Sequence, residues 1–483
     1  MRIKKKELLE MIDQLIEINT LIDKDGRFPE GVDAPECQEL ALKLGNFIED
    51  KYKESNPEDI IHSLEDYCEL IYQMSLTENE EQTKLHKLVK KVKVVLLSAR
   101  HGIEYDLPKD RKQVVFLPYK VSMWDSLESI WMAAHRDPEV DDYVIPIPYF
   151  DRNPDGTFAE MHYEGDQYPD YVPVTNWQEY SISDEKPEVI FIHNPYDKAN
   201  YVTSVHPAFY SSELKKWTDC LVYVPYFVVN GTDASFFTNM GVYNSDYIVC
   251  TSEFVRKSYA ETFNDRFGNK DYFEAFLPMG SPKYDKVRNL DISRICIPDE
   301  WNDLISRKKP ENIVFFNTSV ADFLKSDKSF YFERLAKTFN KLAENNYLII
   351  WRPHPLFQAT VDSLASELRD GYEKLLADFN RLGYGIIDTS PDMYPAIYLS
   401  DMYMGDGSSI VLLYMRTGKP LFQFVVGKDE ILYYKQDKCT ERLKKEIEKI
   451  FGTKCTDWEI ELEEVPLNAG ENTYKTILEK IGK

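Results

Sequence analysis

Three short stretches in the second half of the sequence place polar side chains directly after a run of apolar residues. The stretches are FFNTSV, IIWRPHP and YMGDGSS, and each continues a segment that is typical of a buried strand. The candidate site residues that they supply are Asn317, Thr318, Ser319, Arg352, His354, Gly405, Asp406, Gly407, Ser408 and Ser409. Guanidinium, imidazole, hydroxyl and amide groups are the usual partners of phosphate oxygens. We therefore expect a phosphate site at these strand ends.

The stretch GDGSS has the composition of an anion-binding turn. It precedes the apolar run IVLLY, which is typical of a helix starting near Ile410. Glycines let the backbone approach a ligand closely, and the N–H groups at a helix N-terminus attract an anion. The alternative interpretation is that Ser408 or Ser409 only caps the helix, and the motif alone does not decide between the two.

The histidine of WRPHP is held between two prolines. Pro353 and Pro355 restrict the loop, and such preorganisation is what electrostatic catalysis requires. His354 is therefore a candidate to donate a hydrogen bond to a phosphate oxygen or to protonate a leaving group. Arg352 could neutralise charge or merely hold the loop. A histidine satisfied within the fold is the competing interpretation.

Strand-like and helix-like segments alternate from residue 113 onward, which is typical of parallel sheets covered on both faces. We expect a first series of strands at 113–119, 143–150, 187–194, 220–229 and 246–252. A second series is expected at 312–319, 347–355, 385–390, 401–409 and 420–425, with helices between them at 329–345, 359–383, 395–400 and 410–418. Ligands of such sheets lie beyond the carboxyl ends of the strands, where the three polar stretches fall.

The domain organisation follows from these patterns. With 483 residues the chain is too long for one core. The sequence predicts an α/β protein: a helical region at 1–98, a first Rossmann-like domain at 112–285, a second at 286–428, and a helical tail at 429–483. In the first region, apolar residues at helical spacing predict an amphipathic helix: Leu8, Met11, Leu15, Ile18 and Ile22. The two doubly wound domains are expected to face each other across a cleft.

The motifs as a set resemble the CDP-glycerol glycerophosphotransferase family, the teichoic-acid primases and polymerases. The resemblance lies in NTSV, WRPHPL and SDMYMGDGSSIVLLYMRTGKPLFQF, because that family has an RPHP histidine and a strand–D-x-SS–helix phosphate site followed by GKP. NSDYIVCTSEFVRKSYAETF and MGSPKYDKV resemble the end of the family's first domain, which closes with Gly-x-Pro-x-x-Asp. The likeness extends over roughly residues 112–428 and implies a GT-B-type fold.

The resemblance also implies a reaction and a donor site. Glycerol phosphate, or a related polyol phosphate, would pass from CDP-glycerol or another CDP-polyol to a hydroxyl of a polymer or lipid-linked acceptor, with release of CMP. Carried over by match, His354 and the segment Asp406–Ser409 would hold the diphosphate, with Arg352, Asn317, Thr318 and Ser319 in support. No protein-bound cofactor or metal is expected; a Mg²⁺ ion carried by the diphosphate is left open.

The first domain departs from the family pattern. The family places a His-Gly pair near an early strand end, with the histidine proposed as general base, whereas the corresponding stretch here, YVPYFVVNG, has no histidine. His193, at the end of the strand-like PEVIFIHN, is the substitute candidate for the catalytic base. His206 and Asp125 are weaker candidates, and Tyr226 could line an acceptor groove.

Composition excludes several other classes. A formal net charge of −24 argues against a nucleic-acid partner. Seven scattered cysteines without a CxxC pair favour reduced thiols, and no apolar run approaches the length of a membrane span. A cytoplasmic protein is expected, with basic segments at Lys4–Lys6 and residues 87–93 that would suit peripheral contact with the inner membrane face.

Two other functions stay open at this level. A GT-B glycosyltransferase or a sugar-nucleotide epimerase would use a similar cleft but would want a carboxylate near the sugar. A non-catalytic CDP-binding protein of an envelope assembly would explain the missing histidine of the first domain.

Overall fold

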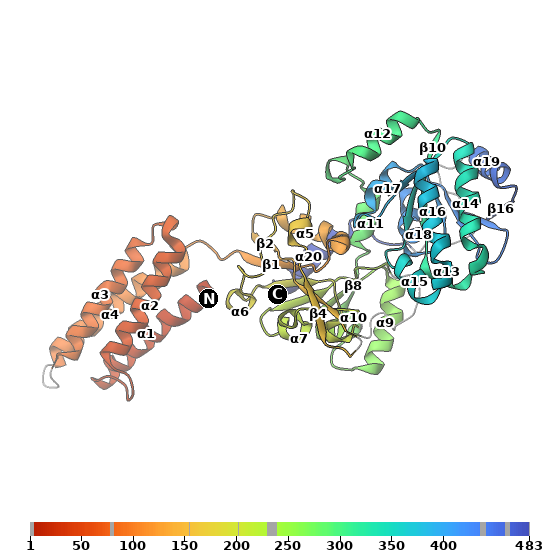
Figure 1. The fold of residues 1–483 in the computed structure, drawn as a ribbon. Helices are drawn as coiled ribbons and strands as arrows, with labels where there is room; N and C mark the ends of the chain where they lie inside the picture. Colours follow the sequence, from red (N-terminus) through yellow and green to blue (C-terminus); the bar gives the residue numbers. More distant parts are fainter. Residues whose placement is uncertain are drawn as a thin grey trace. The chain divides into compact units, whose positions relative to one another are not determined.

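The computed structural model describes residues 4–77, 82–153, 155–200, 202–228, 239–434, 441–458 and 464–482 (Figure 1). The chain divides into two compact units. The first takes in Met1–Lys112 with the short segment Ser183–Glu185, and the second takes in Gln113–Ile182 and Lys186–Lys483.

The first unit is a bundle of antiparallel helices with its own apolar core. Its helices are α1 (Lys5–Asp25), α2 (Ala34–Tyr52), α3 (Glu58–Ser75) and α4 (Gln82–His101), followed by a π-helical turn (Gly102–Asp106). The start of α2 is fixed by Asp33, whose side chain accepts from the Glu36 N–H, and α1 ends at Gly26 in the left-handed conformation.

The inner face of α1 differs slightly from the predicted stripe. Leu8, Leu15 and Ile22 are buried as expected, whereas Met11 and Ile18 are only half-buried. Ile12 and Asn19 take inner positions instead, and the Asn19 side-chain amide donates to the Val89 carbonyl at 3.3 Å. A buried amide becomes tolerable only with such a partner, which sequence spacing does not reveal.

The first sheet of the second unit has six strands in the order β2-β1-β5-β7-β8-β9. They are β1 (Lys112–Leu117), β2 (Val140–Val144), β5 (Val189–Ile192), β7 (Cys220–Tyr223), β8 (Tyr247–Cys250) and β9 (Phe276–Pro278). From β1 through β5, β7 and β8 to β9 the pairing is parallel. Helices α5 (Glu128–His135), α9 (Glu253–Arg266) and α20 (Ala469–Ile481) bury side chains against it.

The strand predicted at 143–150 is wrong as one continuous element. Pro146 and Pro148 remove backbone donors, so β2 ends at Val144 and a new strand, β3 (Tyr149–Arg152), begins in another sheet. This small antiparallel sheet has the order β4-β3-β6, with β4 (Phe158–His162) and β6 (Thr203–Val205). It was not predicted.

The second sheet has seven strands in the order β12-β11-β10-β13-β14-β15-β16. They are β10 (Asn312–Thr318), β11 (Tyr347–Pro353), β12 (Gly385–Ile387), β13 (Met402–Gly405), β14 (Leu421–Phe424), β15 (Ile431–Tyr434) and β16 (Cys455–Asp457). Neighbouring strands run parallel except for the antiparallel pair β14 and β15.

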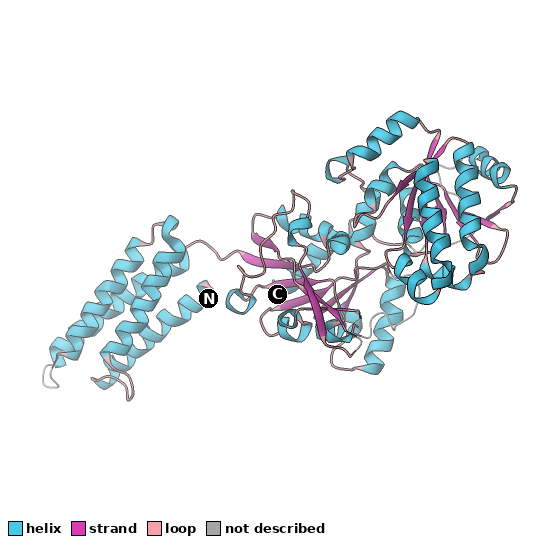
Figure 2. Ribbon diagram, in the orientation of Figure 1, coloured by secondary structure: helices cyan, strands magenta, loops and turns pink. Residues whose placement is uncertain are grey.

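Helices cover both faces of the second sheet (Figure 2). They are α13 (Val320–Lys325), α14 (Lys328–Glu344), α15 (Phe357–Leu364), α16 (Arg369–Leu382), α17 (Tyr394–Leu399), α18 (Ser409–Tyr414) and α19 (Glu441–Phe451). The single helix predicted at 359–383 is two helices, α15 and α16, with a 3₁₀ turn at Ser366–Leu368 between them. Between β9 of the first sheet and β10 of the second, the chain forms α11 (Pro282–Arg288) and α12 (Asp299–Lys308).

The segment 429–483, expected to be a helical tail, is divided between the two sheets. Strands β15 and β16 extend the second sheet and α19 packs on it, whereas Tyr474 and Ile477 of α20 enter the core of the first. The N-terminus of α20 is held by Asp285 of α11, whose carboxylate accepts from the Ala469 and Gly470 amides at 3.0 and 2.8 Å. The tail thereby links the two α/β domains.

The fold class is confirmed: two α/β domains with parallel sheets follow an N-terminal helical region. A cavity of 570 Å³ lies between the α/β domains, lined from the first by Val121, Trp124 and Asp125 and from the second by Asp392 and Tyr394. Among the described helices, none combines the length and the apolar character needed to cross a bilayer.

Candidate functional site

The three polar stretches meet at one edge of the second sheet. Strand β10 pairs in parallel with both β11 and β13, and Asn317 lies opposite Arg352 on one side and Gly405 on the other. Parallel strands present their carboxyl ends at the same edge. The register therefore confirms the prediction that these stretches adjoin.

Asn317 fastens the three strand ends together. Its side-chain Nδ2 donates to the Arg352 carbonyl at 2.9 Å, and its Oδ1 accepts from the Ser408 Oγ at 2.9 Å. The side chain is 2% exposed, so its polar atoms serve the fold. Asn317 therefore holds the strand ends together from within the protein, and a ligand would contact other, exposed residues.

Gly405 is required by the close approach of β13 to β10. Its φ of +142° lies in a region that L side chains rarely adopt, and a Cβ there would come within 2.2 Å of the Asn317 carbonyl oxygen. The turn that begins at Gly405 can follow this path only with glycine at its start.

Substitution of Gly405 by alanine should therefore damage both fold and site. We expect a loss of about 3 kcal/mol in the free energy of unfolding, from the forced φ and the clash with Asn317. Gly427→Ala is the matched control, because Gly427 also has a positive φ (+72°) but a Cβ added to it would meet nothing within 4 Å. Chemical denaturation measures both. Equal losses of unfolding free energy in the two variants would show that the clash with the Asn317 carbonyl does not contribute.

Asp406 is an internal organiser of the turn. It is 1% exposed, and its Oδ2 accepts from the Ser319 N–H at 2.9 Å and the Tyr331 hydroxyl at 2.6 Å, with Arg334 at 3.8 Å from Oδ1. Burial raises its pKa to about 6. Its predicted part in holding the diphosphate is therefore indirect, because its oxygens already bind the loop that carries Ser319.

The raised pKa of Asp406 gives a test of this burial. In the unfolded chain the carboxyl has an ordinary pKa near 3.8, so the folded state binds the extra proton and loses stability as pH rises from about 4 to about 6. The loss should amount to about 3 kcal/mol relative to Asp406→Asn, which does not titrate. Denaturation of both proteins across this range measures it. Parallel pH profiles would contradict the burial of a titrating carboxyl.

The other groups of the turn divide into occupied and accessible ones. The Gly407 N–H donates to Asp322 at 2.8 Å, and the Ser408 Oγ accepts from the Ile410 N–H at 3.3 Å, so Ser408 caps α18. Ser409 is exposed at the first position of that helix. Of the two interpretations of the double serine, capping applies to Ser408, and Ser409 is the hydroxyl that a ligand can reach.

The two hydroxyls at the end of β10 also serve the fold. Thr318 is fully buried and its Oγ1 accepts from the Trp351 indole N–H at 3.2 Å. The Ser319 Oγ caps α13 by accepting from the Asp322 N–H at 3.1 Å. Their predicted contact with phosphate remains a prediction, and in this conformation both oxygens face protein donors.

His354 lies on the exposed side of the edge. Its backbone N–H donates to the Thr318 carbonyl at 3.0 Å, and its Nδ1 accepts from the Leu356 N–H at 3.1 Å. Because Nδ1 is the acceptor, the neutral ring carries its proton on Nε2, and that donor belongs to an exposed side chain. Partial desolvation lowers the pKa of His354, which favours this neutral form. The imidazole is thus oriented as a hydrogen-bond donor.

Arg352 holds the loop. The residue is 8% exposed, and its guanidinium pairs with Asp388 at 2.5 Å and with the Ser390 carbonyl at 2.8 Å. Both partners follow β12, the strand next to β11, so the arginine ties two neighbouring loops together. Of the two roles considered for Arg352, this geometry supports the structural one. Asp388 was missed, although the strand-like GII before it gave the same strand-end signal.

The histidines of the first domain do not face the cleft in this structure. His193 is fully buried, its Nε2 accepts from the Tyr119 N–H at 3.1 Å, and its Nδ1 lies 3.0 Å from the Ser126 Oγ. Burial lowers its pKa to about 3. The nitrogen that a general base would use is occupied, so this geometry does not support His193 in that role. His206 accepts from the Ala208 N–H within its own turn, and the Tyr226 hydroxyl lies 3.4 Å from that of Tyr196.

A buried ion pair lies beside the cleft, and a tyrosine of the second domain joins it. Lys283 of α11 approaches both carboxylate oxygens of Asp125 at 2.6 Å, and the Tyr394 hydroxyl of the second domain donates to Asp125 at 2.6 Å. Lys283 and Asp125 are only 5% and 4% exposed. Asp125, a weaker candidate for catalysis, is thus committed to structure. Its two partners were not predicted, although Lys283 lies within the conspicuous MGSPKYDKV.

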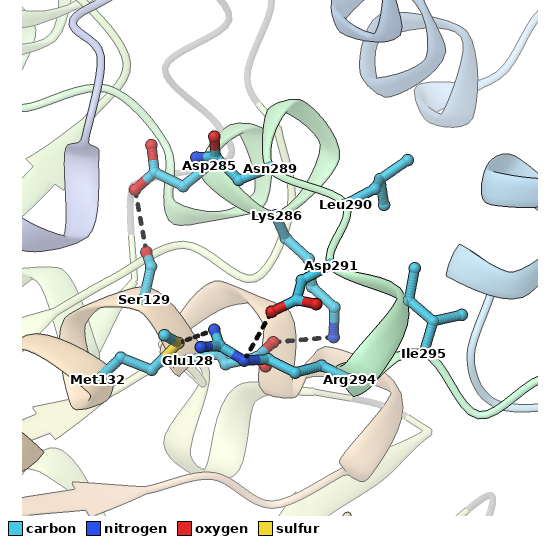
Figure 3. A pocket seen from close by; sticks show the side chains of 10 residues that line it. All are labelled: Glu128, Ser129, Met132, Asp285, Lys286, Asn289, Leu290, Asp291, Arg294 and Ile295. Atoms are coloured by element: carbon cyan, nitrogen blue, oxygen red, sulfur yellow. Dashed lines mark hydrogen bonds and ion pairs between the residues drawn. The ribbon is translucent and has the colours of Figure 1, made fainter.

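A second group of charges lines a smaller cavity of 110 Å³ nearby (Figure 3). Figure 3 shows Lys286 and Glu128 directed toward each other, and Arg294 beside Asp291. The Lys286 ammonium lies 2.8 Å from the Glu128 carboxylate, and the Arg294 Nε lies 3.5 Å from the Asp291 carboxylate. The Lys286 ammonium also lies 4.5 Å from the centre of the Tyr394 ring. These paired groups continue the contact between the domains, and Lys286 and Arg294 reach the wall of the larger cavity as well.

The described residues contain no group of three or more His, Cys, Asp or Glu side chains placed to hold a metal ion. Asp322 and Asp406, the carboxylates nearest the edge, are engaged by amide and hydroxyl donors.

Comparison with known proteins confirms the family resemblance over part of the chain. Residues 230–447 match the family described as CDP-Glycerol:Poly(glycerophosphate) glycerophosphotransferase. The match includes all three polar stretches of the second sheet and excludes β1 and β5 of the first. No curated protein matches the chain.

The solved structures to which the chain is similar include the following three. A variant of the wall teichoic acid polymerase TagF with CDPG is 15% identical, covering 77% of this chain and 89% of its own, with a TM-score of 0.40. The UDP-GlcNAc 2-epimerase of Methanocaldococcus jannaschii is 11% identical, covering 76% and 99%, with a TM-score of 0.42. MnaA of S. aureus with UDP is 11% identical, covering 77% and 89%, with a TM-score of 0.39. Similarities of this size do not decide between a transferase and an epimerase.

Proposed function

We propose that this protein transfers a polyol phosphate, glycerol phosphate first among the candidates, from a CDP-activated donor to a hydroxyl group, and releases CMP. The observation that carries the proposal is the coincidence of two facts. The segment that matches the glycerophosphotransferase family contains the edge where His354 and Ser409 are accessible above a network of buried side chains. The acceptor that follows from the family's description is a polyol-phosphate polymer or its precursor.

The chemistry of the edge fits a phosphoryl transfer. The acceptor oxygen forms a bond to the β-phosphorus, the bond from that phosphorus to the bridging oxygen breaks, and the electron pair leaves with CMP. Negative charge spreads over the oxygens in the transition state, so donors held in place supply most of the acceleration. The Nε2–H of His354 is such a donor, because Leu356 fixes the ring from the other side. It would bind a phosphoryl or bridging oxygen.

Buried residues keep this donor in place. The Arg352–Asp388 pair binds the end of β11, just before His354, to the loop after β12. Asn317 binds β11 to the turn that contains Ser408. A Mg²⁺ ion carried by the diphosphate would add charge neutralisation as part of the substrate. Membrane contact and a cytoplasmic location remain expectations from the sequence.

A comparison of ligands tests the proposal. CDP-glycerol, CDP-ribitol and UDP-N-acetylglucosamine should be compared for thermal stabilisation, since a ligand selective for the folded state adds about 2.7 kcal/mol at a hundred times its Kd. We expect stabilisation by a CDP-polyol and CMP release from it in the presence of a polyol-phosphate acceptor. Stabilisation by the UDP-sugar alone would favour a nucleotide-sugar enzyme. CDP binding without turnover over several acceptors would favour a non-catalytic role.

A further inference from the structure

The proposed transfer needs a group that removes the proton of the acceptor hydroxyl, and the described part of the first domain offers no accessible histidine at the cleft for it. The cavity of 570 Å³ between the domains supplies carboxylates instead: Asp125, Asp170 and Asp392 line it. The wall also carries aromatic rings, from Trp124, Tyr168 and Tyr171. Carboxylates and aromatic rings suit a polyol, whose hydroxyls donate to oxygens and whose C–H groups pack on rings.

Asp392 is positioned by the same contacts that hold the His354 loop. It follows β12, which pairs with β11, the strand that leads to His354. Arg352 binds Asp388 and the Ser390 carbonyl, and the Ser390 Oγ in turn donates to the Asp392 carbonyl at 2.7 Å. One arginine therefore fixes both the proline-flanked loop and the loop that ends in Asp392.

The Asp392 carboxylate combines access with partial desolvation. One oxygen accepts from the Tyr394 N–H at 2.9 Å, and the other has no hydrogen bond or ion pair with any of the described residues. The side chain is half-buried in the cavity wall. The charged groups near it are Lys286 of α11, Asp125 of the turn before α5, and Glu128 of α5. Burial is the main cause of its raised pKa, which Lys286 partly offsets.

The competing carboxylates near the cavity are either exposed or already committed: Asp170 lines the cavity but is exposed, so it lacks the partial desolvation of Asp392. Asp125 is held by Lys283 and Tyr394. Glu128 pairs with Lys286 and accepts from Tyr171. Neither Asp125 nor Glu128 could accept a proton without breaking an ion pair. Asp392 is the carboxylate of the second domain that reaches the cavity without such a pair.

The wall also carries two cationic side chains. Lys286 and Arg294 reach the same wall and would attract the phosphate of a polyol phosphate. Together, the carboxylate, aromatic and cationic groups of the wall complement a polyol hydroxyl end that is attached to a phosphodiester.

We infer that this cavity is the acceptor site, that it takes the hydroxyl end of a polyol phosphate, and that Asp392 is the general base of the transfer. The inference rests on the proposed function. The proton of the acceptor hydroxyl passes to the Asp392 carboxylate while the acceptor oxygen bonds to the β-phosphorus and CMP departs with the electron pair of the bridging oxygen. Protonated Asp392 then returns the proton to water.

Asp392→Asn tests the inference. With CDP-glycerol as donor and a short poly(glycerol phosphate) as acceptor probe, we expect the rate of CMP release to fall at least about a hundredfold, the lower range for a general base. The Kd for CDP-glycerol, measured by calorimetry, should stay within about twofold, because the donor site is elsewhere on the edge. Asp303→Asn, an exposed position on α12, is the matched control and should keep its full rate.

Two further readouts separate a base from a structural residue. The acidic limb of the pH–rate profile, which follows ionisation of Asp392, should disappear in Asp392→Asn. Formate should restore part of the rate of Asp392→Gly by replacing the missing carboxylate. A normal rate in Asp392→Asn, loss of donor binding together with the rate, or no rescue by formate would each overturn the inference. If the wild-type protein neither binds nor cleaves CDP-glycerol, the proposed function itself fails.

Discussion

Replacing His354 with glutamine should reduce the rate of CMP release from CDP-glycerol by about 10²–10³-fold, the range found when one preorganised transition-state donor is removed. Glutamine keeps an amide donor, but it lacks the imidazole ring whose Nε2–H the Leu356 amide orients by binding Nδ1. The loss should appear in kcat, because a donor aimed at developing charge acts in the transition state. Steady-state assays of released CMP measure it.

The His354 variant should remain folded. The imidazole is exposed, and the hydrogen bond that its ring makes within the described chain is the one from Leu356, so the melting temperature should change little. His62→Gln is the matched control: His62 is exposed on α3, in the helical bundle, and its substitution should leave CMP release unchanged. A His354 variant that releases CMP at a rate near that of wild type would remove the imidazole from the mechanism.

Lys283→Met should be strongly destabilising, because it leaves the buried Asp125 carboxylate without its cation. We expect a loss of about 3–5 kcal/mol in the free energy of unfolding, the usual range when one partner of a buried pair is removed. Asp125 is 4% exposed, and its remaining donor from another domain would be the Tyr394 hydroxyl. Guanidinium denaturation measures the loss.

The double variant Lys283→Met with Asp125→Asn distinguishes a buried charge from lost packing. Asparagine is neutral and can still accept from Tyr394, so the double variant should be more stable than Lys283→Met alone. Lys257→Met serves as control for the change of side chain, because Lys257 is exposed on α9, outside this network. If the two substitutions simply added, or if Lys283→Met were as stable as wild type, the buried ion pair would not stabilise the fold.

The sequence predicted the sheets well because their strands are buried on both faces. NIVFFNT, YLIIWRP and MYMG are continuous apolar runs, and burial selects such runs whatever their neighbours are. The strand at 143–150 failed because Pro146 and Pro148 interrupt the ladder within an otherwise apolar run. The prediction for the tail failed because β15 (ILYY) has only four residues and β16 (CTD), the edge strand, has three and little apolar signal.

The site was predicted in part. Their positions at strand ends correctly predicted that Asn317, Arg352 and Gly405 lie at one edge of the sheet, because neighbouring strands of this fold class run parallel. Whether a polar atom faces a ligand or a protein donor depends on distant partners. Lys283 and Asp125 are 158 residues apart and Tyr394 and Asp125 are 269 apart, so no local spacing announces these contacts. His193 shows the same limit, because its sequence position does not reveal that the Tyr119 amide occupies its Nε2.

A crystal structure of the protein soaked with CDP-glycerol tests the proposed donor site most directly. We expect diphosphate oxygens within hydrogen-bond distance of the His354 Nε2 and of Ser409, at the carboxyl edge of β10, β11 and β13. A diphosphate bound at any other place, with the His354 ring making no contact to it, would contradict the assignment of this edge as the donor site.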